Sequence, residues 1–162
     1  MRVFSIAAFV AFLIDQISKY VVIHMMELAR IRSIEVLPPV LNFRYGENRG
    51  INFGLGGDMS QWVLVAVALV ICAGVTLWLW RSPHGRWAQL SGGLLVGGAL
   101  ANVADRLIYG YVLDFLNNSC CGINNPFVYN LADVFIFAGA LGLILFTGEP
   151  KSAPKRRGKK GQ

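Results

Sequence analysis

The chain has 162 residues, of which 55% are hydrophobic and only 15% are charged, and its mean hydropathy is +0.52. A soluble domain of this size would have about a quarter of its residues charged, so the composition indicates a small membrane protein. The net charge is +6, but six of the fifteen basic residues lie between Lys151 and Lys160. In a membrane protein such a tail sets topology and contacts anionic lipid, so we expect no nucleic-acid partner.

The first apolar stretch covers residues 3–23. Its apolar run resembles the core of a signal peptide, but no small-residue cleavage site follows it, so we expect a retained helix. Asp15 and Lys19 are spaced i, i+4 with the acid first, which places them on one helix face and permits an ion pair. The pair is either structural or in contact with a substrate or the backbone.

Three further stretches, at 62–80, 88–108 and 128–146, are close to the roughly 20 residues that cross a bilayer. The stretch at 88–108 is rich in small residues, and Gly93 and Gly97 form a GxxxG pair of the kind that lets helices approach closely in lipid. The sequence therefore predicts four transmembrane helices in a single polytopic membrane domain spanning residues 1–162.

The distribution of basic residues predicts the topology. Arg2, the 81–86 loop and the basic tail at 147–162 fall on one side, which the positive-inside rule makes cytoplasmic. Residues 24–61 and 109–127 then face the other side. Four arginines in the first of these outer segments run against the rule, although acids alternate with them.

The two outer segments differ in character. Residues 24–36 begin with an amphipathic pattern and are predicted to lie on the membrane surface. Residues 40–55 alternate around a glycine-containing turn, which predicts a β-hairpin, either as a wall of a site or as a stabilising cap. In the second segment, Cys120 and Cys121 lack a suitably placed histidine, so neither cysteine catalysis nor a metal site is expected.

Three acids lie in or beside the last two apolar stretches, at about the same depth: Asp105, Asp114 and Asp133. Intramembrane acids are costly and are usually functional or paired. Two carboxylates that share a site share one proton, so that one activates water while the other donates a proton. Asp105 points about 100° away from its neighbour Arg106 around a helix, so it is expected to pair with a different helix or with the interface. Arg106 would still keep it permanently charged, which favours Asp114 and Asp133 for this chemistry.

Five blocks of the sequence occur in an order and spacing that resemble the lipoprotein signal peptidase (signal peptidase II) family. They are DQISK (15–19), ENRGINFG (47–54), GGALANVADR (97–106), GYVLDF (110–115) and VYNLAD (128–133). The resemblance implies an aspartic endopeptidase of the bacterial inner membrane, with both termini cytoplasmic and its active site at the periplasmic face. It also implies cleavage of prolipoproteins just before a diacylglyceryl-modified cysteine, inhibition by globomycin, and a small periplasmic β-sheet.

By position in these blocks, the resemblance implies that Asp114 and Asp133 are the catalytic dyad and that Asp105 is a structural acid. It implies that a further set of residues binds substrate or braces the site: Asp15, Lys19, Asn48, Gly50, Asn102, Arg106 and Asn130. The expected partners are lipidated prolipoproteins, membrane lipids and globomycin-type inhibitors. No cofactor or metal is expected, and the chain is expected to act as a monomer.

Two other functions compete with this one. A proton- or ion-coupled transporter could use intramembrane acids as a relay, but relay acids are expected near the middle of the bilayer. The three acids cluster at one end, whereas Asp15 lies deeper and Lys19 can neutralise it. A scaffold with polar packing residues would tolerate replacement of the acids by asparagine.

Overall fold

The computed structural model describes residues 1–38, 40–50, 57–82, 84–119 and 125–147. Cys120 and Cys121 and nearly all of the basic tail lie outside these described residues. The chain forms, in order, α1 (Arg2–Lys19), the π-helical turns η1 (Tyr20–Met25), α2 (Leu28–Ile31), β1 (Ser33–Leu37), β2 (Leu41–Asn48), α3 (Gly57–Arg81), α4 (Arg86–Tyr109), β3 (Val112–Asn117) and α5 (Leu131–Phe146).

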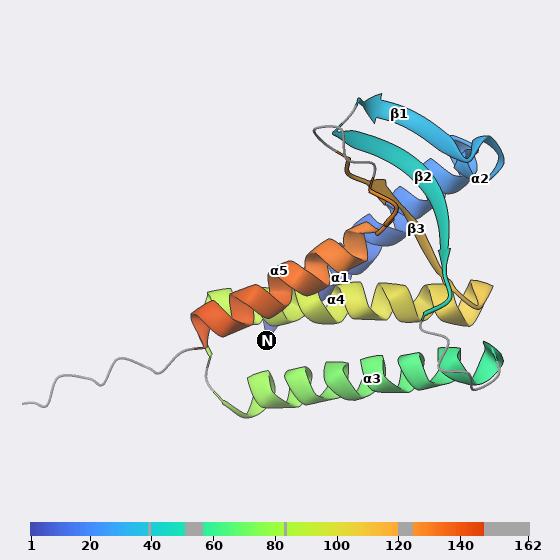
Figure 1. Cartoon of the computed structure of the whole chain (residues 1–162). Coiled ribbons are helices and arrows are strands. Elements are labelled where there is room, and N and C mark those ends of the chain that lie inside the picture. The colour runs from blue at the N-terminus through green and yellow to red at the C-terminus, as the bar shows by residue number, and fades with distance from the viewer. Residues whose placement is uncertain (39, 51–56, 83, 120–124, 148–162) are drawn as a thin grey trace, which may run out of the picture.

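Helix α4 lies at the centre of the bundle and packs against α1, α3 and α5 (Figure 1). Its small residues allow this close packing. A Cβ atom added to Gly93 would lie 2.5 Å from the Phe4 carbonyl oxygen of α1, and one added to Gly97 would meet the Ala8 carbonyl of the same helix. The predicted role of this glycine pair in helix packing is confirmed, because nothing larger than hydrogen fits at either position.

A three-stranded antiparallel sheet, ordered β1-β2-β3, stands at one end of the bundle (Figure 1). Strand β3 begins just after α4, where Gly110 ends the helix with a φ of 84°. Helices end readily at a glycine in this left-handed conformation. Strand β2 pairs with β3 so that Gly46 lies opposite Asp114. The sheet therefore holds Asp114 close to the end of α4.

Beneath the sheet, a hydrophobic cluster joins it to η1 and α2. The cluster consists of Val22, Ile23, Leu28, Leu113 and Phe115, with Phe43, Tyr45 and others packed against it. Burial of such side chains contributes about 1.5–3 kcal/mol each, so the sheet is anchored to the bundle.

Helices occur at all four predicted apolar stretches. Among the described residues, Arg2–Met25 and Gln61–Arg81 are long and apolar enough to cross a membrane, and Leu131–Phe146 is a shorter apolar helix.

The outer segments depart from the expectation. The first arm of the predicted hairpin is confirmed as part of β2, but the predicted turn is wrong, because β2 continues through it to Asn48 and forms its hairpin with β1. Residues 51–55 of the second arm lie outside the described residues. Residues 24–36 form the end of η1, α2 and most of β1. Strand β3 lies in the 109–127 segment, where no strand was predicted.

Candidate active site

Asp114 lies in the middle of β3, with its side chain almost fully buried at 3% exposure. The opposing residue is Gly46, and a Cβ atom there would lie 3.4 Å from the Val128 Cβ and 3.6 Å from the Asp114 Cβ. These separations are ordinary van der Waals contacts, so position 46 lies directly against the backbone end of the Asp114 side chain. The strand pairing explains how a buried acid is held just beyond a helix end.

Asp133 lies in the first turn of α5, where it forms a capping box with Asn130. The backbone amide of Asp133 donates to Asn130 Oδ1 (3.0 Å), and the backbone amide of Asn130 donates to Asp133 Oδ2 (3.4 Å). This exchange satisfies two amides at the helix start and fixes the carboxylate there. The positive end of the helix dipole favours a negative charge at this position.

Asn130 joins the two acids directly. Its side-chain amide donates to Asp114 Oδ1 at 2.6 Å, while its side-chain oxygen caps the helix that carries Asp133. The Asn102 amide donates to Asp133 Oδ1 at 2.8 Å, and Asn102 Oδ1 accepts from Asn130 Nδ2 at 3.2 Å. Two asparagines from different helices thus connect the acids in one hydrogen-bond network.

The electrostatic surroundings set the proton affinity of Asp114. Burial raises the pKa of Asp114 to about 7, and the charge of Asp133 acts in the same direction. Hydrogen bonds from the Asn130 and Asn48 side chains oppose the rise but do not overcome it. A carboxyl group with such a pKa is largely protonated just below neutral pH.

A second network of charged groups lies behind the acids. Lys19 Nζ lies 2.7 Å from Asp15 Oδ2 and 2.7 Å from Asp105 Oδ2, and all three side chains are buried. The predicted Asp15–Lys19 ion pair is confirmed. Asp105 was expected to point away from Arg106 and to pair with a different helix or with the interface, and its ion pair is with Lys19 of α1. Arg106 also attracts Asp105.

Both acids of this network also hold parts of the candidate site. Asp15 Oδ1 accepts the backbone amide of Ala132 in α5 at 2.8 Å, and Asp105 Oδ2 accepts that of Leu113 in β3 at 3.1 Å. Ala132 and Leu113 directly precede Asp133 and Asp114 in sequence. The buried charges therefore attach the segments that carry the two acids to the helix bundle.

The remaining predicted residues either bind one of the two acids or bind a residue that does. The Asn48 side chain hydrogen-bonds to Asp114 and accepts the amide of Gly50 at 3.1 Å. Gly50 has a φ of 79°, which favours glycine. Arg106 donates to the Asn102 backbone carbonyl at 3.3 Å and is attracted to Asp133, Asp105 and Asp114.

Sequence reasoning missed one member of the network, Gln16. Its side-chain amide donates to Asp105 Oδ1 at 2.9 Å and to the Ala101 carbonyl at 3.4 Å. The available signal was a polar residue next to Asp15 within an otherwise apolar helix. In the described part of the chain, no group of three or more His, Cys, Asp or Glu side chains is arranged to hold a metal ion.

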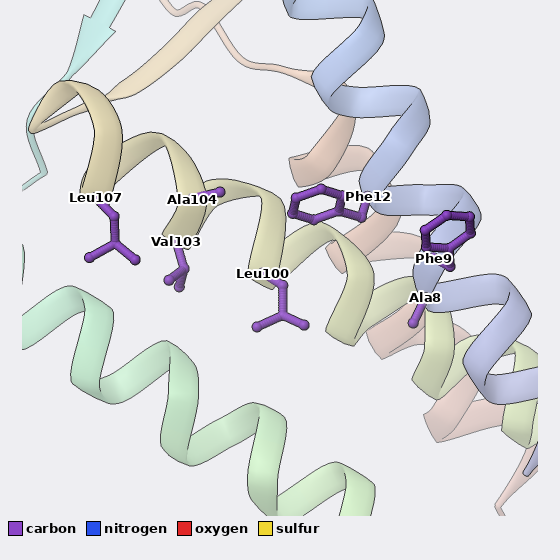
Figure 2. Close-up of a pocket in the computed structure, with 7 residues that line it drawn as sticks. All are labelled: Ala8, Phe9, Phe12, Leu100, Val103, Ala104 and Leu107. Carbon is purple, nitrogen blue, oxygen red and sulfur yellow. The ribbon is translucent and has the colours of Figure 1, made fainter.

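An apolar groove lies elsewhere on the bundle, with a volume of about 390 Å³. Figure 2 shows its lining, in which Phe9 and Phe12 project from α1 beside apolar side chains of α4. The groove is lined by Ala8, Phe9, Phe12, Leu100, Val103, Ala104 and Leu107. None of these side chains can do acid–base chemistry, so this groove does not supply the reacting groups.

Comparison with solved structures defines the class of protein. Two bacterial membrane enzymes whose structures were determined by the in meso method share the fold. One has a TM-score of 0.72 and 25% sequence identity, with 96% of this chain and 93% of that chain covered. The other has a TM-score of 0.73 and 26% identity, with 89% and 91% covered.

Sequence comparisons identify the family. The family model described as signal peptidase (SPase) II matches residues 7–148. The lipoprotein signal peptidase of Alteromonas mediterranea is 40% identical over 139 residues, covering 83% of this chain and 74% of the relative. That of a Nostoc species is 37% identical over 147 residues, covering 89% and 88%. The chain belongs to the signal peptidase II family and is an aspartic-type protease.

Proposed function

We propose that the chain is an intramembrane aspartic endopeptidase that removes the signal peptide from diacylglyceryl-modified prolipoproteins, cleaving just before the lipidated cysteine. The observation that carries the proposal is the coupling of Asp114 and Asp133 through Asn130 and Asn102. Two electrostatically coupled carboxyl groups that differ in burial can share one proton, as peptide hydrolysis by an aspartic dyad requires.

In this mechanism, one carboxylate removes a proton from a water molecule while the other carboxyl group donates a proton to the scissile carbonyl. Asp105 does not take part, because its ion pair with Lys19 and its bond to the Leu113 amide occupy it structurally. Asn48, Gly50 and Arg106 lie at the edge of the network, where they would contact the peptide.

We further propose that α1 with η1, α3, α4 and α5 are four transmembrane helices of a single domain spanning residues 1–162. The termini then face the cytoplasm and the sheet faces the periplasm of the bacterial inner membrane. The sheet supplies hydrogen-bond partners for β3, whose backbone could not be exposed to lipid. Exposed apolar side chains along the helices, and the groove of Figure 2, would contact lipid chains.

The transporter alternative is not favoured by this arrangement. Asp15 accepts the backbone amide of Ala132 at the start of α5, and Asp105 accepts that of Leu113 in β3. These two acids and the dyad therefore lie at one end of the bundle. A relay would place acids along a path across the membrane. The chain acts as a monomer in this proposal, and globomycin-type inhibitors would occupy the site.

The test is a gel-shift assay with purified protein and a lipidated prolipoprotein, with and without globomycin. We expect Asp114→Asn and Asp133→Asn each to lower cleavage by about 10²–10⁴-fold while the protein stays folded. Glu35→Gln, which alters an exposed acid of β1, is the matched control and should cleave normally. Substantial cleavage by either dyad variant would contradict the assignment, and a precursor without lipid should remain uncut.

A further inference from the structure

A polar pocket of about 140 Å³ lies where α1 and η1 meet the end of α4, and neither acid of the candidate dyad lines it. Its lining residues differ in depth. Lys19 and Asp105 are buried, at 3% and 0% exposure, whereas Tyr20 and Tyr109 are 61% and 41% exposed. The charged groups therefore form the inner end of the pocket, and the tyrosines flank its mouth.

The inner end of the pocket carries an excess of negative charge. Lys19 lies against both Asp15 and Asp105. The hydrogen-bond partners of these two carboxyl groups all donate, because they are the Lys19 ammonium group, the Gln16 side-chain amide and backbone amides of α5 and β3. Both acids are therefore carboxylates, and a single ammonium group leaves one negative charge uncompensated.

Uncharged groups around this charge also suit a cation. Three acceptors surround the side-chain nitrogen of Gln16, namely two carboxylate oxygens and the Ala101 carbonyl. The side-chain oxygen of Gln16 is thus left as an acceptor that no described residue uses. The rings of Tyr20 and His24 lie 5.6 Å apart beside it in the same lining, and the faces of aromatic rings attract cations.

A phosphate group does not suit this pocket. Lys19 is the only lysine or arginine among the described residues that line it. Its three N–H donors face Asp15, Asp105 and the side-chain oxygen of Asn102. An anion would therefore find no free ammonium donor and would meet the excess negative charge.

The apolar groove of Figure 2 leads into this pocket. Ala8 and Phe12 line the groove and Gln16 and Tyr20 line the pocket, and a spacing of four residues keeps all four along one face of the helix. On α4 the groove covers 100–107, which is about 10 Å at about 1.5 Å per residue. One leaflet of a bilayer has about 15 Å of hydrocarbon, so the groove has the length of part of an acyl chain.

We propose that this face of α1 and α4 binds one aminophospholipid from the leaflet at the sheet end of the bundle. The primary ammonium group of an ethanolamine headgroup enters the polar pocket, where it donates to the Gln16 oxygen and lies near Asp105 and the rings. One acyl chain lies in the groove, and the phosphate stays outside the pocket. This lipid site goes beyond the peptidase function and uses only the membrane placement of the helices proposed above.

Native mass spectrometry of the full-length protein in detergent tests the site. The protein is mixed with equal amounts of phosphatidylethanolamine and phosphatidylglycerol that carry the same acyl chains, so both lipids compete in one spectrum. We expect about tenfold more binding of phosphatidylethanolamine, because only this lipid has a cation. N-acetyl-phosphatidylethanolamine, which keeps the phosphate and the chains but lacks the ammonium group, should lose the advantage. Equal binding of the first two lipids, or an advantage that survives acetylation, would overturn the proposal.

Variants at the mouth of the pocket test its part in headgroup choice. The double variant Tyr20→Leu/Tyr109→Leu should bring the two lipids toward equal binding, since it removes two ring faces from exposed positions. Trp62→Leu is the matched control, because Trp62 is a 58% exposed aromatic residue of α3 that does not line the pocket. A full preference in the double variant, or an equal loss in the control, would contradict the assignment.

A variant in the groove separates the acyl chain from the headgroup. Ala104→Phe fills the groove, so it should lower the binding of both lipids while the preference between them stays. Ala66→Phe, on an exposed position of α3, is the control and should change neither. Unchanged binding in Ala104→Phe would refute the chain site. No substrate is present and no cleavage is measured, so failure here is distinct from failure of the peptidase proposal.

Discussion

Lys19 lies between two fully buried acids, and its replacement by methionine is the sharpest test of the charged network. Its ammonium group lies 2.7 Å from both Asp15 and Asp105, and each acid is 0% exposed. Methionine has a similar length and fills the same volume without the charge. Lys19→Met should therefore leave two carboxylates buried next to each other without a cation.

The expected loss is large because the charges have no access to water. Removing one partner of a buried ion pair costs about 3–5 kcal/mol. In a chain of this size each kcal/mol corresponds to roughly 2–4 °C, so the melting temperature should fall by about 6–20 °C at neutral pH. At lower pH the two acids can take up protons, so the loss should shrink as the pH falls.

The measurement is thermal unfolding in detergent, followed by tryptophan fluorescence. Arg30→Met is the matched control, because the Arg30–Glu27 pair has a similar separation, 2.5 Å, but side chains that are 80% and 54% exposed. Exposed pairs contribute about 0–1 kcal/mol. If Lys19→Met melts within the range of the control, the network does not hold the fold as argued. The double variant Lys19→Met/Asp105→Asn should recover part of the loss, because it removes one of the uncompensated charges.

Three further predictions concern the contacts around the dyad. Gly98→Ala should cost about 1–3 kcal/mol and lower cleavage, because a Cβ atom there would lie 2.5 Å from the Ala132 carbonyl and push α5 from α4. Gly74→Ala, where nothing lies within 4 Å, should be neutral or slightly stabilising in the same melting assay. The pKa of Asp114 is about 7 in the folded protein, against an ordinary value of 3.8, so the folded state binds the proton more tightly than the unfolded state does. The contribution of this group to stability is therefore complete below pH 3.8 and is lost as the pH rises through 7. Asp114→Asn should therefore melt higher than the parent at pH 8 but not at pH 4, and an equal change at both would contradict the burial argument. Asn130→Ala should abolish most cleavage, measured by gel shift, because it removes both the donor to Asp114 and the cap of α5.

The helices could be predicted from sequence because each follows from a local pattern. Apolar runs of bilayer length lie where the helices are found, and the spacing of Asp15 and Lys19 predicted their ion pair. The Gly93–Gly97 pair likewise predicted a helix-packing face. These features depend on residues a few positions apart, so the sequence carries them without tertiary information.

The third member of the charged network could not be predicted in the same way. Asp105 is distant from Lys19 in sequence, and its direction depends on how α4 packs against α1. Its place beside Arg106 predicted only that it points to a different helix or to the interface, without naming the partner. Pairing across a helix interface is decided by packing, which a local pattern does not encode.

Strand β3 was missed for a related reason. Its residues are buried on both faces, so they show no alternation of polar and apolar side chains. A short apolar run of this kind, directly after a long apolar helix, has no periodicity that separates a strand from a loop. Its strand character comes from pairing with β2 across a long stretch of sequence.

The missed strand also decides between the two readings of the sheet, as a wall of the site or as a stabilising cap. A carboxyl group just beyond a helix end needs a backbone that is fixed and fully hydrogen-bonded in apolar surroundings. Strand β2 meets this need, since it pairs with β3 on both sides of Asp114. Asn48 at the end of the same strand reaches Asp114 with its side chain. A cap would require only the pairing, whereas the Asn48 side chain also binds the carboxyl group, so we interpret the sheet as one wall of the proposed active site.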